Sequence, residues 1–306
     1  MFRAFFIALS ESRAIRGIAE RSRIGRRMSG RFVAGMSVEE ALTATAATNQ
    51  KGMSVSVDNL GENVTNVEEA KHSAQLYHEM LDALHTRQLN ANVSLKLTHM
   101  GLDVDEKLAL GIVSDVVQHA ARIDNFVRVD MEGSPYTEKT LRFVKDLHRQ
   151  PGNAGHVGAV IQAYLHRSQK DIEELCAEGI RVRLCKGAYK EPANIAWQEK
   201  AEVDANFVRL TKILLKSGTY HGIATHDPKM IEATIDFARA ENISPKSFEF
   251  QMLYGVRRDL QEQLVKDGWG MRVYIPFGTE WYPYLMRRLA ERPANAIFIL
   301  KNLFRK

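Results

Sequence analysis

The stretch VGAVIQAYLHRSQKDIEELCAEGIRVRLCKGAY, residues 157–189, holds two β-type runs separated by a polar-rich helical stretch. The first run is VGAVIQA at 157–163 and the second is RVRLC at 181–185. Two strands joined through a helix in this way run parallel, because parallel neighbours need a long crossover connection. The stretch therefore predicts an α/β protein built from βα units.

The same alternation of runs and helical stretches continues toward both ends of the chain. Six further β-type runs occur at residues 54–58 (SVSVD), 92–97 (NVSLKL), 126–130 (FVRVD), 221–225 (HGIAT), 247–251 (SFEFQ) and 271–275 (MRVYI). Between them, stretches such as 201–215 and 230–240 repeat apolar residues at spacings of three and four, as amphipathic helices do. Eight βα units predict a closed parallel barrel. An open doubly wound sheet is the alternative, and the lack of a glycine-rich dinucleotide turn after the first run favours the barrel.

Composition narrows the class of protein further. With 306 residues, 45% of them apolar and 26% charged, the chain can bury a full core, and intrinsic disorder, collagen and a disulfide scaffold are excluded. The two cysteines, Cys176 and Cys185, form no CxxC spacing and indicate a reducing compartment. The histidines predict no metal site, since His221 and His226 flank a strand instead of sharing a helix face.

The positive charge is concentrated at the amino-terminal end. The net charge is +5, but residues 1–36 hold eight arginines against two glutamates, so the rest of the chain is nearly neutral. A nucleic-acid-binding protein needs its basic residues on the folded body, so this class is excluded. We predict a basic helical arm at residues 1–40, with two or three short helices, and a (βα)8 barrel catalytic domain at residues 41–306.

The arm has two interpretations. Phe2, Phe5, Phe6 and Leu9 form a narrow apolar stripe beside arginines on a predicted helix. Such a helix can lie in the interface of an anionic membrane, or its stripe can pack on the barrel as a structural cap. The apolar run at residues 4–9 is shorter than that of a signal peptide or a membrane-spanning helix. We therefore expect a cytoplasmic protein, with peripheral contact to the inner face of the cytoplasmic membrane under the first interpretation.

Polar residues lie at or near the end of almost every predicted strand. In a barrel of this kind the carboxyl ends of the strands carry the functional site. Buried polar side chains are costly unless they are paired or used, so their repetition at the strand ends indicates a site. These residues are Lys96, Asp130, Gln162, Arg183, Lys186, Thr225, His226, Gln251 and Tyr274. We interpret His226 as a hydrogen-bonding residue at the rim, and Cys185, with no base beside it, as a small buried hydrophobe.

The helix predicted after the last strand offers an anion clamp. Tyr284, Arg287, Arg288 and Glu291 share one face of this helix. Two guanidiniums beside a tyrosine suit a small carboxylate, because each presents a planar fork of donors. The alternative is a solvated face with an Arg–Glu pair. The turn KGAY at 186–189 is a weaker signal, in which small residues let the backbone approach a phosphate or a flat ring.

Seven segments together resemble the proline dehydrogenase family. They are residues 93–98 (VSLKLT), 127–132 (VRVDME), 162–165 (QAYL), 181–189 (RVRLCKGAY), 224–227 (ATHD), 248–255 (FEFQMLYG) and 282–295 (YPYLMRRLAERPAN). They follow the family's order, and the length is similar to that of monofunctional bacterial members without an aldehyde dehydrogenase half. The resemblance implies a distorted (βα)8 TIM-type barrel with N-terminal helices that holds FAD. It also implies oxidation of L-proline to 1-pyrroline-5-carboxylate, the first step of proline degradation to glutamate, with a membrane quinone as electron acceptor.

The same resemblance implies roles for individual residues. The proline carboxylate would be held by Lys96, Arg287 and Arg288, and the proline ring would be surrounded by Leu253, Tyr274 and Tyr284. FAD would be contacted by Met131, Gln162, Arg183, Lys186, Gly187, Ala188, Thr225 and His226. The catalytic residues would be Asp130, at the family's acidic position, and Arg183, near the flavin N5. Glu62 would pair with Arg287 to gate the site, and Asn59 stands where many members carry histidine.

The implied mechanism is hydride transfer from proline C5 to flavin N5. The cations would fix the carboxylate so that C5 faces the flavin, and they would favour the neutral amine. Arg183 would stabilise the reduced flavin. Two other classes remain open at this point. One is a Schiff-base lyase with Lys96 or Lys186 as nucleophile, and the other is a non-enzymatic membrane-surface protein that acts through its basic arm.

Overall fold

The structure is a computed structural model that describes residues 30–62 and 64–291. In this part of the chain eight parallel strands close into a barrel in sequence order. They are β1 (Ser54–Asn59), β2 (Ala91–Leu95), β3 (Val127–Val129), β4 (Val157–Gln162), β5 (Arg181–Cys185), β6 (His221–Ala224), β7 (Phe248–Leu253) and β8 (Met271–Phe277). The predicted barrel is confirmed, and each predicted strand agrees with the observed strand to within two residues at either end.

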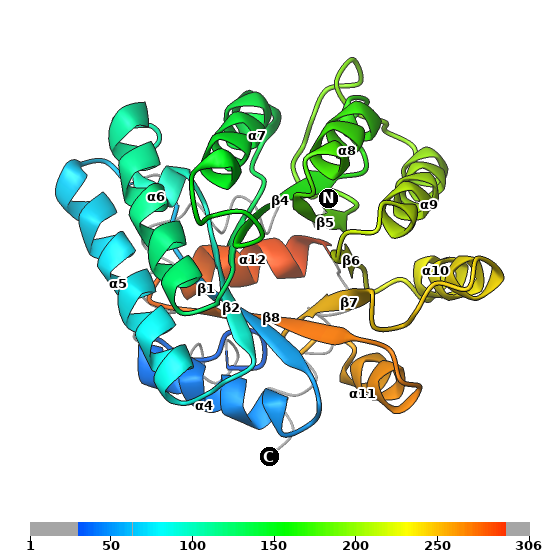
Figure 1. The fold of residues 1–306 in the computed structure, drawn as a ribbon, viewed down its shortest axis with the longest axis horizontal. Coiled ribbons are helices and arrows are strands. Elements are labelled where there is room, and N and C mark those ends of the chain that lie inside the picture. The colour runs from blue at the N-terminus through cyan, green and yellow to red at the C-terminus, as the bar shows by residue number, and fades with distance from the viewer. Residues whose placement is uncertain (1–29, 63, 292–306) are drawn as a thin grey trace.

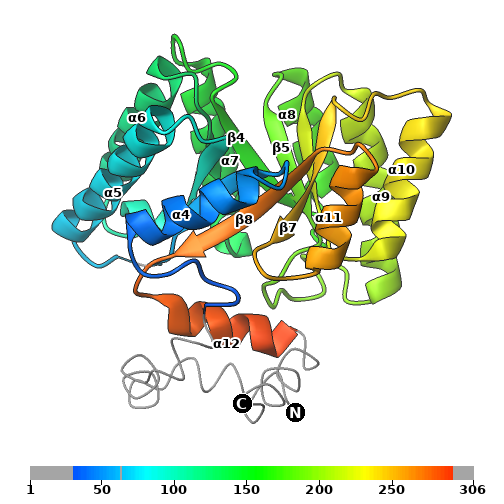
Figure 2. The ribbon, with the colours of Figure 1, turned by 90° about the horizontal axis from the view of Figure 1, so that it is seen from below.

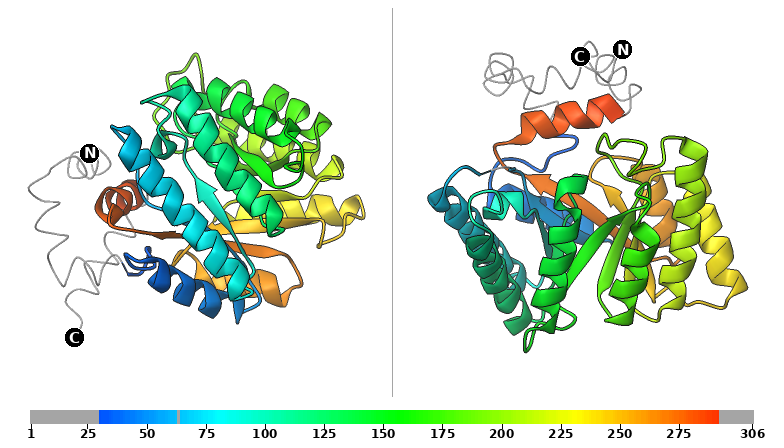
Figure 3. Two further views of the ribbon diagram at one scale, coloured as in Figure 1. Left: turned by 60° about the vertical axis from the view of Figure 1, so that its left-hand side comes forward. Right: turned by 90° about the horizontal axis from the view of Figure 1, so that it is seen from above.

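A helix follows each strand (Figure 1). These helices are α5 (Val67–Thr86), α6 (Glu106–Arg122), α7 (Ser134–Arg149), α8 (Ser168–Ala177), α9 (Lys200–Lys216), α10 (Pro228–Ala240), α11 (Arg258–Lys266) and α12 (Trp281–Glu291). A short 3-10 helix, η1 (Thr98–Met100), precedes α6, and α4 (Val38–Asn49) precedes β1. Figures 1 and 3 show α5 to α11 arranged around the outside of the strands. The helices predicted at residues 201–215 and 230–240 are confirmed as α9 and α10.

Helix starts are fixed by side chains that the local sequence supplies. Ser37 and Glu40 form a reciprocal capping box at the start of α4. The Asp105 carboxylate accepts a hydrogen bond from the Leu108 N–H at 2.8 Å and begins α6. Asp227 begins α10 by accepting from the Lys229 N–H at 3.2 Å. Because α10 starts immediately after β6, this cap also places Asp227 at the carboxyl end of the barrel.

The strand register gathers the carboxyl ends of the strands at one mouth of the barrel. β1 pairs with β2 on one side and with β8 on the other, which closes the ring. In the β1–β8 pair, Ser54 lies opposite Arg272 and Asn59 opposite Phe277. All neighbouring strands are parallel, so their carboxyl ends share one face. We call this end the catalytic mouth and the opposite end the amino-terminal mouth.

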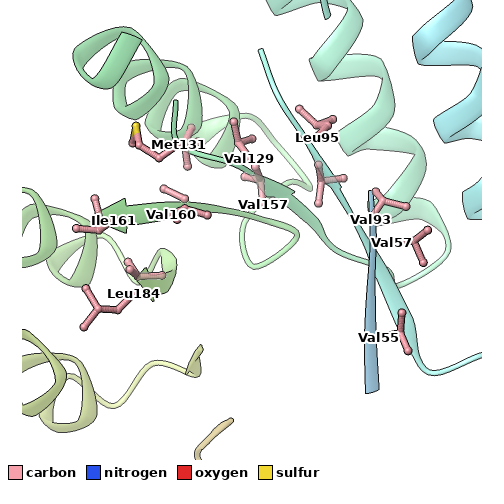
Figure 4. Packing of buried hydrophobic residues seen from close by; sticks show 14 of the residues in the cluster. Val55, Val57, Val93, Leu95, Val129, Met131, Val157, Val160, Ile161 and Leu184 are labelled. Atoms are coloured by element: carbon pink, nitrogen blue, oxygen red, sulfur yellow. The ribbon is translucent and has the colours of Figure 1, made fainter. Parts of the chain in front are cut away.

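Side chains on the strands alternate between the helix layer and the barrel axis. Val55 and Val57 of β1, and Val93 and Leu95 of β2, are fully buried in the main hydrophobic core (Figure 4). The axis-facing positions between them are polar. The same holds on the other side of the barrel, where hydrogen bonds join Arg128, Arg183, Glu249, Gln251 and Arg272 to other strands. Barrels of this class are usually filled by branched aliphatic side chains. Here paired polar groups occupy much of the interior.

The last helix departs from the outer ring. Figure 2 shows α12 across one end of the barrel, beyond the tip of β8. Trp281 and Tyr284 of α12 are buried in a small cluster with Phe32, Val33 and Leu60. The Ala34 N–H also donates to the carbonyl of Pro276 at 2.8 Å. The segment before α4 and the last helix therefore pack together at the catalytic mouth.

The predicted arm at residues 1–40 overlaps a helix of the structure at its carboxyl end and lies largely outside the described residues. α4 runs across the boundary drawn at residue 40 between the predicted arm and the barrel domain. The apolar stripe predicted at residues 2–9 lies outside the described residues. Within residues 30–62 and 64–291, no helix is both long enough and apolar enough to span a membrane.

Candidate active site

Arg183 lies on the barrel axis and is held by side chains from four other strands. Its Nε donates to Gln251 Oε1 at 2.6 Å, and its Nη1 donates to Asp130 Oδ1 at 2.7 Å. Nη2 donates to Ser56 Oγ at 3.1 Å, and Nη1 also lies 3.3 Å from Ser94 Oγ. The residue is only 6% exposed. Because every nitrogen of the guanidinium has a partner, the charge is fixed in one position on the axis.

Asp130 joins Arg183 to Tyr274. Asp130 Oδ1 accepts from Arg183 and from Ser94 Oγ at 2.8 Å, while Oδ2 accepts from the Tyr274 hydroxyl at 2.8 Å. The Arg183 guanidinium carbon lies 5.1 Å from the centre of the Tyr274 ring. Burial, with the charges of Asp130 and Asp58, raises the pKa of Tyr274 well above its usual value. Tyr274 is therefore a protonated donor, and the two residues predicted to be catalytic are in direct contact with one of the predicted substrate residues.

The hydrogen bonds continue down the axis from Gln251. Its amide nitrogen donates to Glu249 Oε1 at 2.6 Å, and Glu249 also accepts from Arg272 Nε at 2.5 Å. Burial disfavours the carboxylate, but the Arg272 charge and the hydrogen bonds from Arg272, Gln251 and Tyr220 together outweigh it and lower the pKa of Glu249. A side chain at Gly222 would displace the Gln251 amide, so glycine at this position of β6 leaves room for that amide on the axis. A continuous chain of polar contacts thus connects the catalytic mouth with the amino-terminal mouth.

Lys96 lies at the rim directly after β2, among carboxylates. Its Nζ is 3.5 Å from Asp58 Oδ2 and 4.0 Å from Glu62 Oε1. Burial disfavours the charged amine, but Asp58, Glu62 and Asp130 outweigh it and raise the pKa of Lys96. Asp58 is 1% exposed, and burial raises its pKa to about 6 although the Lys96 charge opposes this. Lys96 is therefore a permanent cation at neutral pH.

The turn after β5 is built around an ion-pair cluster. Lys186 Nζ contacts Asp227 Oδ2 at 2.8 Å and also bonds Asp204 of α9. Gly187 follows in a left-handed conformation with φ of +111°, where a side chain would also collide with the Tyr164 ring. Only glycine satisfies both conditions, so the backbone at Gly187 and Ala188 keeps a close approach to the mouth.

The other predicted cofactor residues line the ends of β3, β4 and β6. Met131 is buried just beyond β3, and the Gln162 amide donates to the backbone oxygen of Glu132 at 3.0 Å. Thr225 Oγ1 accepts from the Asp227 N–H at 3.1 Å. His226 Nε2 accepts from the Leu253 N–H at 2.9 Å, so the neutral ring carries its proton on Nδ1. The prediction that His226 is a hydrogen-bonding residue at the rim is confirmed.

The predicted anion clamp lies on α12. Tyr284 is buried at 7% exposure, facing the cluster of Phe32 and Leu60 at the catalytic mouth. Arg287 and Arg288 follow it on the same helix, but their side chains, and that of Glu291, lie outside the described part of the structure. Of the three cations predicted for the proline carboxylate, the described side chains therefore include Lys96 alone.

Several residues of the network were absent from the sequence-based predictions. Asp58 ends the first predicted strand and could have been found by the rule that selected Asp130. Ser56, Ser94 and Glu249 alternate with apolar residues along their strands, which is the pattern of an axis-facing position. The alternation alone does not say whether such a side chain faces the axis or solvent.

A cysteine nucleophile and a metal site are less well supported by the described residues. Cys185, predicted to be a small buried hydrophobe, packs against the main core but is only half-buried. Cys176 is also half-buried, and burial raises the pKa of its thiol, which opposes a nucleophilic role. Among the described residues no group of three or more His, Cys, Asp or Glu side chains is arranged to hold a metal ion.

Comparison with known proteins identifies the family. A sequence profile described as proline dehydrogenase matches residues 41–301. The chain is 40% identical to proline dehydrogenase 2 of Bacillus subtilis over 304 residues, which is 99% of each protein. It is 38% identical over 281 residues to a proline dehydrogenase of Deinococcus radiodurans, covering 91% of this chain and 90% of that protein.

A solved structure extends the match to the fold. The crystal structure of proline utilization A from Bdellovibrio bacteriovorus inactivated by N-propargylglycine matches with a TM-score of 0.82 and 28% identity over 87% of this chain. This chain spans 33% of that longer protein. The sequence profile covers most of the chain, and the two bacterial relatives are matched over nearly their whole length. The chain belongs to the proline dehydrogenase family of enzymes.

Proposed function

We propose that the catalytic mouth binds FAD and L-proline and oxidises L-proline to 1-pyrroline-5-carboxylate, the first step of proline degradation to glutamate. The observation that carries this proposal is the fixed Arg183–Asp130–Tyr274 group on the barrel axis. It presents a buried guanidinium and a buried hydroxyl donor at the base of a mouth whose rim carries the Lys96 cation. Family membership is the basis for the proposed reaction. The positions of Arg183, Asp130, Tyr274 and Lys96 support this end of the barrel as the place where it occurs.

The residues at this mouth fit a dinucleotide flavin cofactor. A flavin ring needs hydrogen-bond donors beside its nitrogens, and a pyrophosphate needs a cation and closely approaching backbone. The axis supplies Arg183, and the turn after β5 supplies Lys186 with a glycine that no other residue could replace. We propose that FAD is held by Met131, Gln162, Arg183, Lys186, Gly187, Ala188, Thr225 and His226. When bound, FAD would supply the hydride acceptor for proline C5 at its N5 atom.

The substrate would lie between the rim and α12. Lys96 is charged and half-enclosed by carboxylates, so it can attract a carboxylate while remaining fixed. Arg287 and Arg288 would complete the anion site from α12, with Leu253, Tyr274 and Tyr284 around the ring. Glu62 already lies 4.0 Å from Lys96 and would pair with Arg287 to close the mouth. This arrangement orients the ring by its carboxylate, which leaves C5 as the atom presented to the axis.

Arg183 would stabilise the negative charge of the reduced cofactor, and Asp130 would hold Arg183 in position. A fixed guanidinium beside the site of reduction favours the reduced, more negative form of the cofactor. Asp130 bonds both Arg183 and Tyr274, so it holds the guanidinium and the ring-packing tyrosine in register. The substrate amine must lose its proton before C5 can be oxidised, and cations at the rim lower the pKa of that amine.

The lyase alternative is disfavoured by the state of its candidate nucleophile. A Schiff-base lysine must be neutral, usually through a pKa lowered by burial or by a neighbouring cation. The pKa of Lys96 is instead raised by three carboxylates, and Lys186 is bound by two aspartates. Neither amine is free to attack a carbonyl.

The electrons taken from proline must pass from the reduced cofactor to an acceptor outside the protein. We infer that a membrane quinone accepts them, as the family resemblance implies. Such an acceptor requires the cytoplasmic enzyme to reach the inner face of the membrane, and the basic arm at residues 1–40 is the candidate for that peripheral contact.

The absorption spectrum of the purified full-length protein tests this proposal. We expect flavin bands in the visible region, release of FAD on denaturation, and proline-dependent reduction of a dye. Borohydride treatment in the presence of substrate serves as the control, because a lyase would be trapped as an adduct on Lys96 without any flavin. A protein that stays colourless after incubation with FAD and does not oxidise L-proline would contradict the proposal.

A further inference from the structure

A hollow lies at the amino-terminal mouth of the barrel, opposite the catalytic mouth. It has a volume of about 600 Å³. Its walls come from the turns before β2, β3 and β4 and from the first residues of β5 and β8, including Asn90, Arg181 and Arg272. A space of this size is sufficient for a small-molecule ligand. The family's reaction, placed at the other end, makes no use of it.

Arg181 presents an unpaired charge to this hollow. Its guanidinium carbon lies 5.2 Å from the centre of the Phe126 ring and 6.0 Å from that of Tyr220, so the side chain is stacked in place. Toward the described residues it makes no hydrogen bond or ion pair through its side chain, although it is half-buried. A stacked guanidinium keeps its fork of N–H donors in the plane of the group, ready for a planar or tetrahedral oxyanion.

The charge behind Arg181 is also positive. Arg128 is buried, and its Nη1 donates to the backbone oxygens of Ala159 at 2.9 Å and of Arg181 at 2.6 Å. No described carboxylate forms an ion pair with it. Burial, together with the charges of Arg183 and Arg272, lowers the pKa of Arg128. Because its hydrogen-bond partners are neutral backbone oxygens, the Arg128 guanidinium adds to the positive potential at this end.

Negative charge does not balance these arginines. Arg272 is neutralised by Glu249 through the bond from its Nε, at 2.5 Å, leaving Arg128 and Arg181 in excess. Among the residues that line the hollow, the one acid is Asp124, which is exposed on a turn where solvent screens it. Asn90 is exposed in the wall, and its side chain makes no hydrogen bond within the described residues. The surface thus combines excess positive charge with the uncommitted side-chain amide of Asn90.

We propose that the amino-terminal mouth binds a small molecule that carries two or more negative charges on phosphate or carboxylate groups, with Arg181 as its principal ligand. The stacked fork would take one oxyanion group, and the amide-lined wall would take polar groups beside it. A multiply charged ligand would also satisfy the excess charge of Arg128. The proposal does not depend on the reaction at the catalytic mouth.

Calorimetric titration of the full-length enzyme tests the proposal. Inorganic pyrophosphate serves as the phosphate probe and citrate as the carboxylate probe, each at constant ionic strength and without divalent metals. We expect saturable binding of at least one probe, and the probe that binds more tightly identifies the ligand class. Arg181→Gln should raise the dissociation constant about tenfold or more, because it removes a charge-assisted fork.

Three further variants separate the proposed effect from misfolding and from general charge effects. Asn90→Asp adds a carboxylate to the exposed wall without touching the barrel interior, and it should also weaken binding. Arg142→Gln makes the same charge change as Arg181→Gln on the outer face of α7, where Arg142 bonds Glu106, and it should leave binding unchanged. Arg288→Met, at the catalytic mouth, should likewise leave it unchanged.

Three results of these titrations would contradict the proposal. Absence of saturable binding for both probes would overturn the proposal. Equal affinity in the wild type, Arg181→Gln and Asn90→Asp would overturn it as well. Loss of binding in Arg288→Met would place the anion at the proline carboxylate site and would refute a separate site at the amino-terminal mouth.

Discussion

Asp58 carries a buried negative charge at neutral pH, and the burial of that charge destabilises the folded protein. It is 1% exposed, its Oδ1 has no hydrogen-bond partner among the described residues, and Oδ2 lies 3.5 Å from Lys96. Burial raises its pKa to about 6 in the folded protein, against about 3.9 for an unfolded chain. A carboxyl group with a raised folded pKa stabilises the fold when protonated. That contribution is fully present below about pH 4 and is lost as the pH rises through 6.

Asp58→Asn removes this dependence. Relative to the wild type, the free energy of unfolding of the variant should rise by on the order of 2–3 kcal/mol between pH 4 and pH 7. Lys96 stays charged throughout this range, and its attraction for the Asp58 carboxylate is already contained in the folded pKa of about 6, so it adds no separate pH dependence. Urea unfolding at the two pH values measures the effect. Glu62→Gln, which alters a more exposed neighbour, is the control, and parallel pH profiles for Asp58→Asn and the wild type would show that Asp58 does not titrate in this range.

Arg288 tests the substrate site on the neighbouring helix. Arg288→Met should raise the Michaelis constant for proline about tenfold or more while FAD stays bound, because it removes a charge-assisted fork to the carboxylate. Arg287→Met should also raise the Michaelis constant for proline, but by less, because Arg287 would pair with Glu62 when the site is empty. Steady-state kinetics together with the flavin content measure both. An unchanged Michaelis constant in Arg288→Met would remove this residue from the site.

At the residue scale, the sequence indicated which strand ends carry polar side chains but not the partners of each side chain. Asp130, Arg183 and Tyr274 could be selected because each is polar at or near the carboxyl end of a strand, and the structure brings them into contact. The partners of Lys186 could not be predicted, since Asp204 reaches it only through the packing of α9. The pairing of Lys96 with Asp58 depends on the register of β1 against β2, which no local pattern encodes.

At the element scale, the turn after β5 combines a strained backbone with a steric limit. Gly187→Ala would place a Cβ in a left-handed conformation and against the Tyr164 ring. We expect the variant to fold but to retain less FAD after purification, because the backbone at Gly187 must move away from the mouth. Flavin content per folded protein, with circular dichroism as the measure of folding, gives the result.

Gly179→Ala is the matched control for this turn. Gly179 also has a positive φ, +69°, but nothing lies within 4 Å of its hypothetical Cβ. It should lose about 1 kcal/mol of stability from the positive φ alone, with normal flavin content. Equal flavin content in Gly187→Ala and Gly179→Ala would mean that the turn after β5 does not position the cofactor.

Strands and helices could be predicted from the sequence because their patterns are local. Runs such as SVSVD and FEFQ alternate apolar and polar residues, and the barrel uses this alternation to separate its helix layer from its polar axis. The position of α12 could not be predicted in the same way. Its apolar face is visible in the sequence, but its packing partners, Phe32 and Leu60, are distant in the chain.

At the scale of the whole molecule, we propose different tasks for the two ends of the barrel and for the arm. The arm prediction concerns residues outside the described structure. Deleting residues 1–12 should weaken binding to anionic vesicles, and high salt should do the same to the full chain, since the arm combines aromatic residues with arginines. Proline:dye activity in solution should persist. If the truncated protein binds vesicles as strongly as the full chain, or unfolds, the arm is a structural cap.

The central claim is that Arg183, fixed on the barrel axis, faces the flavin and sets its reactivity. The most direct measurement is the flavin midpoint potential of Arg183→Met and its rate of anaerobic reduction by L-proline in a stopped-flow instrument. Removing a positive charge beside the reducible ring should make the potential more negative and slow the reduction. A variant that binds FAD with an unchanged potential and is reduced at the wild-type rate would contradict the account.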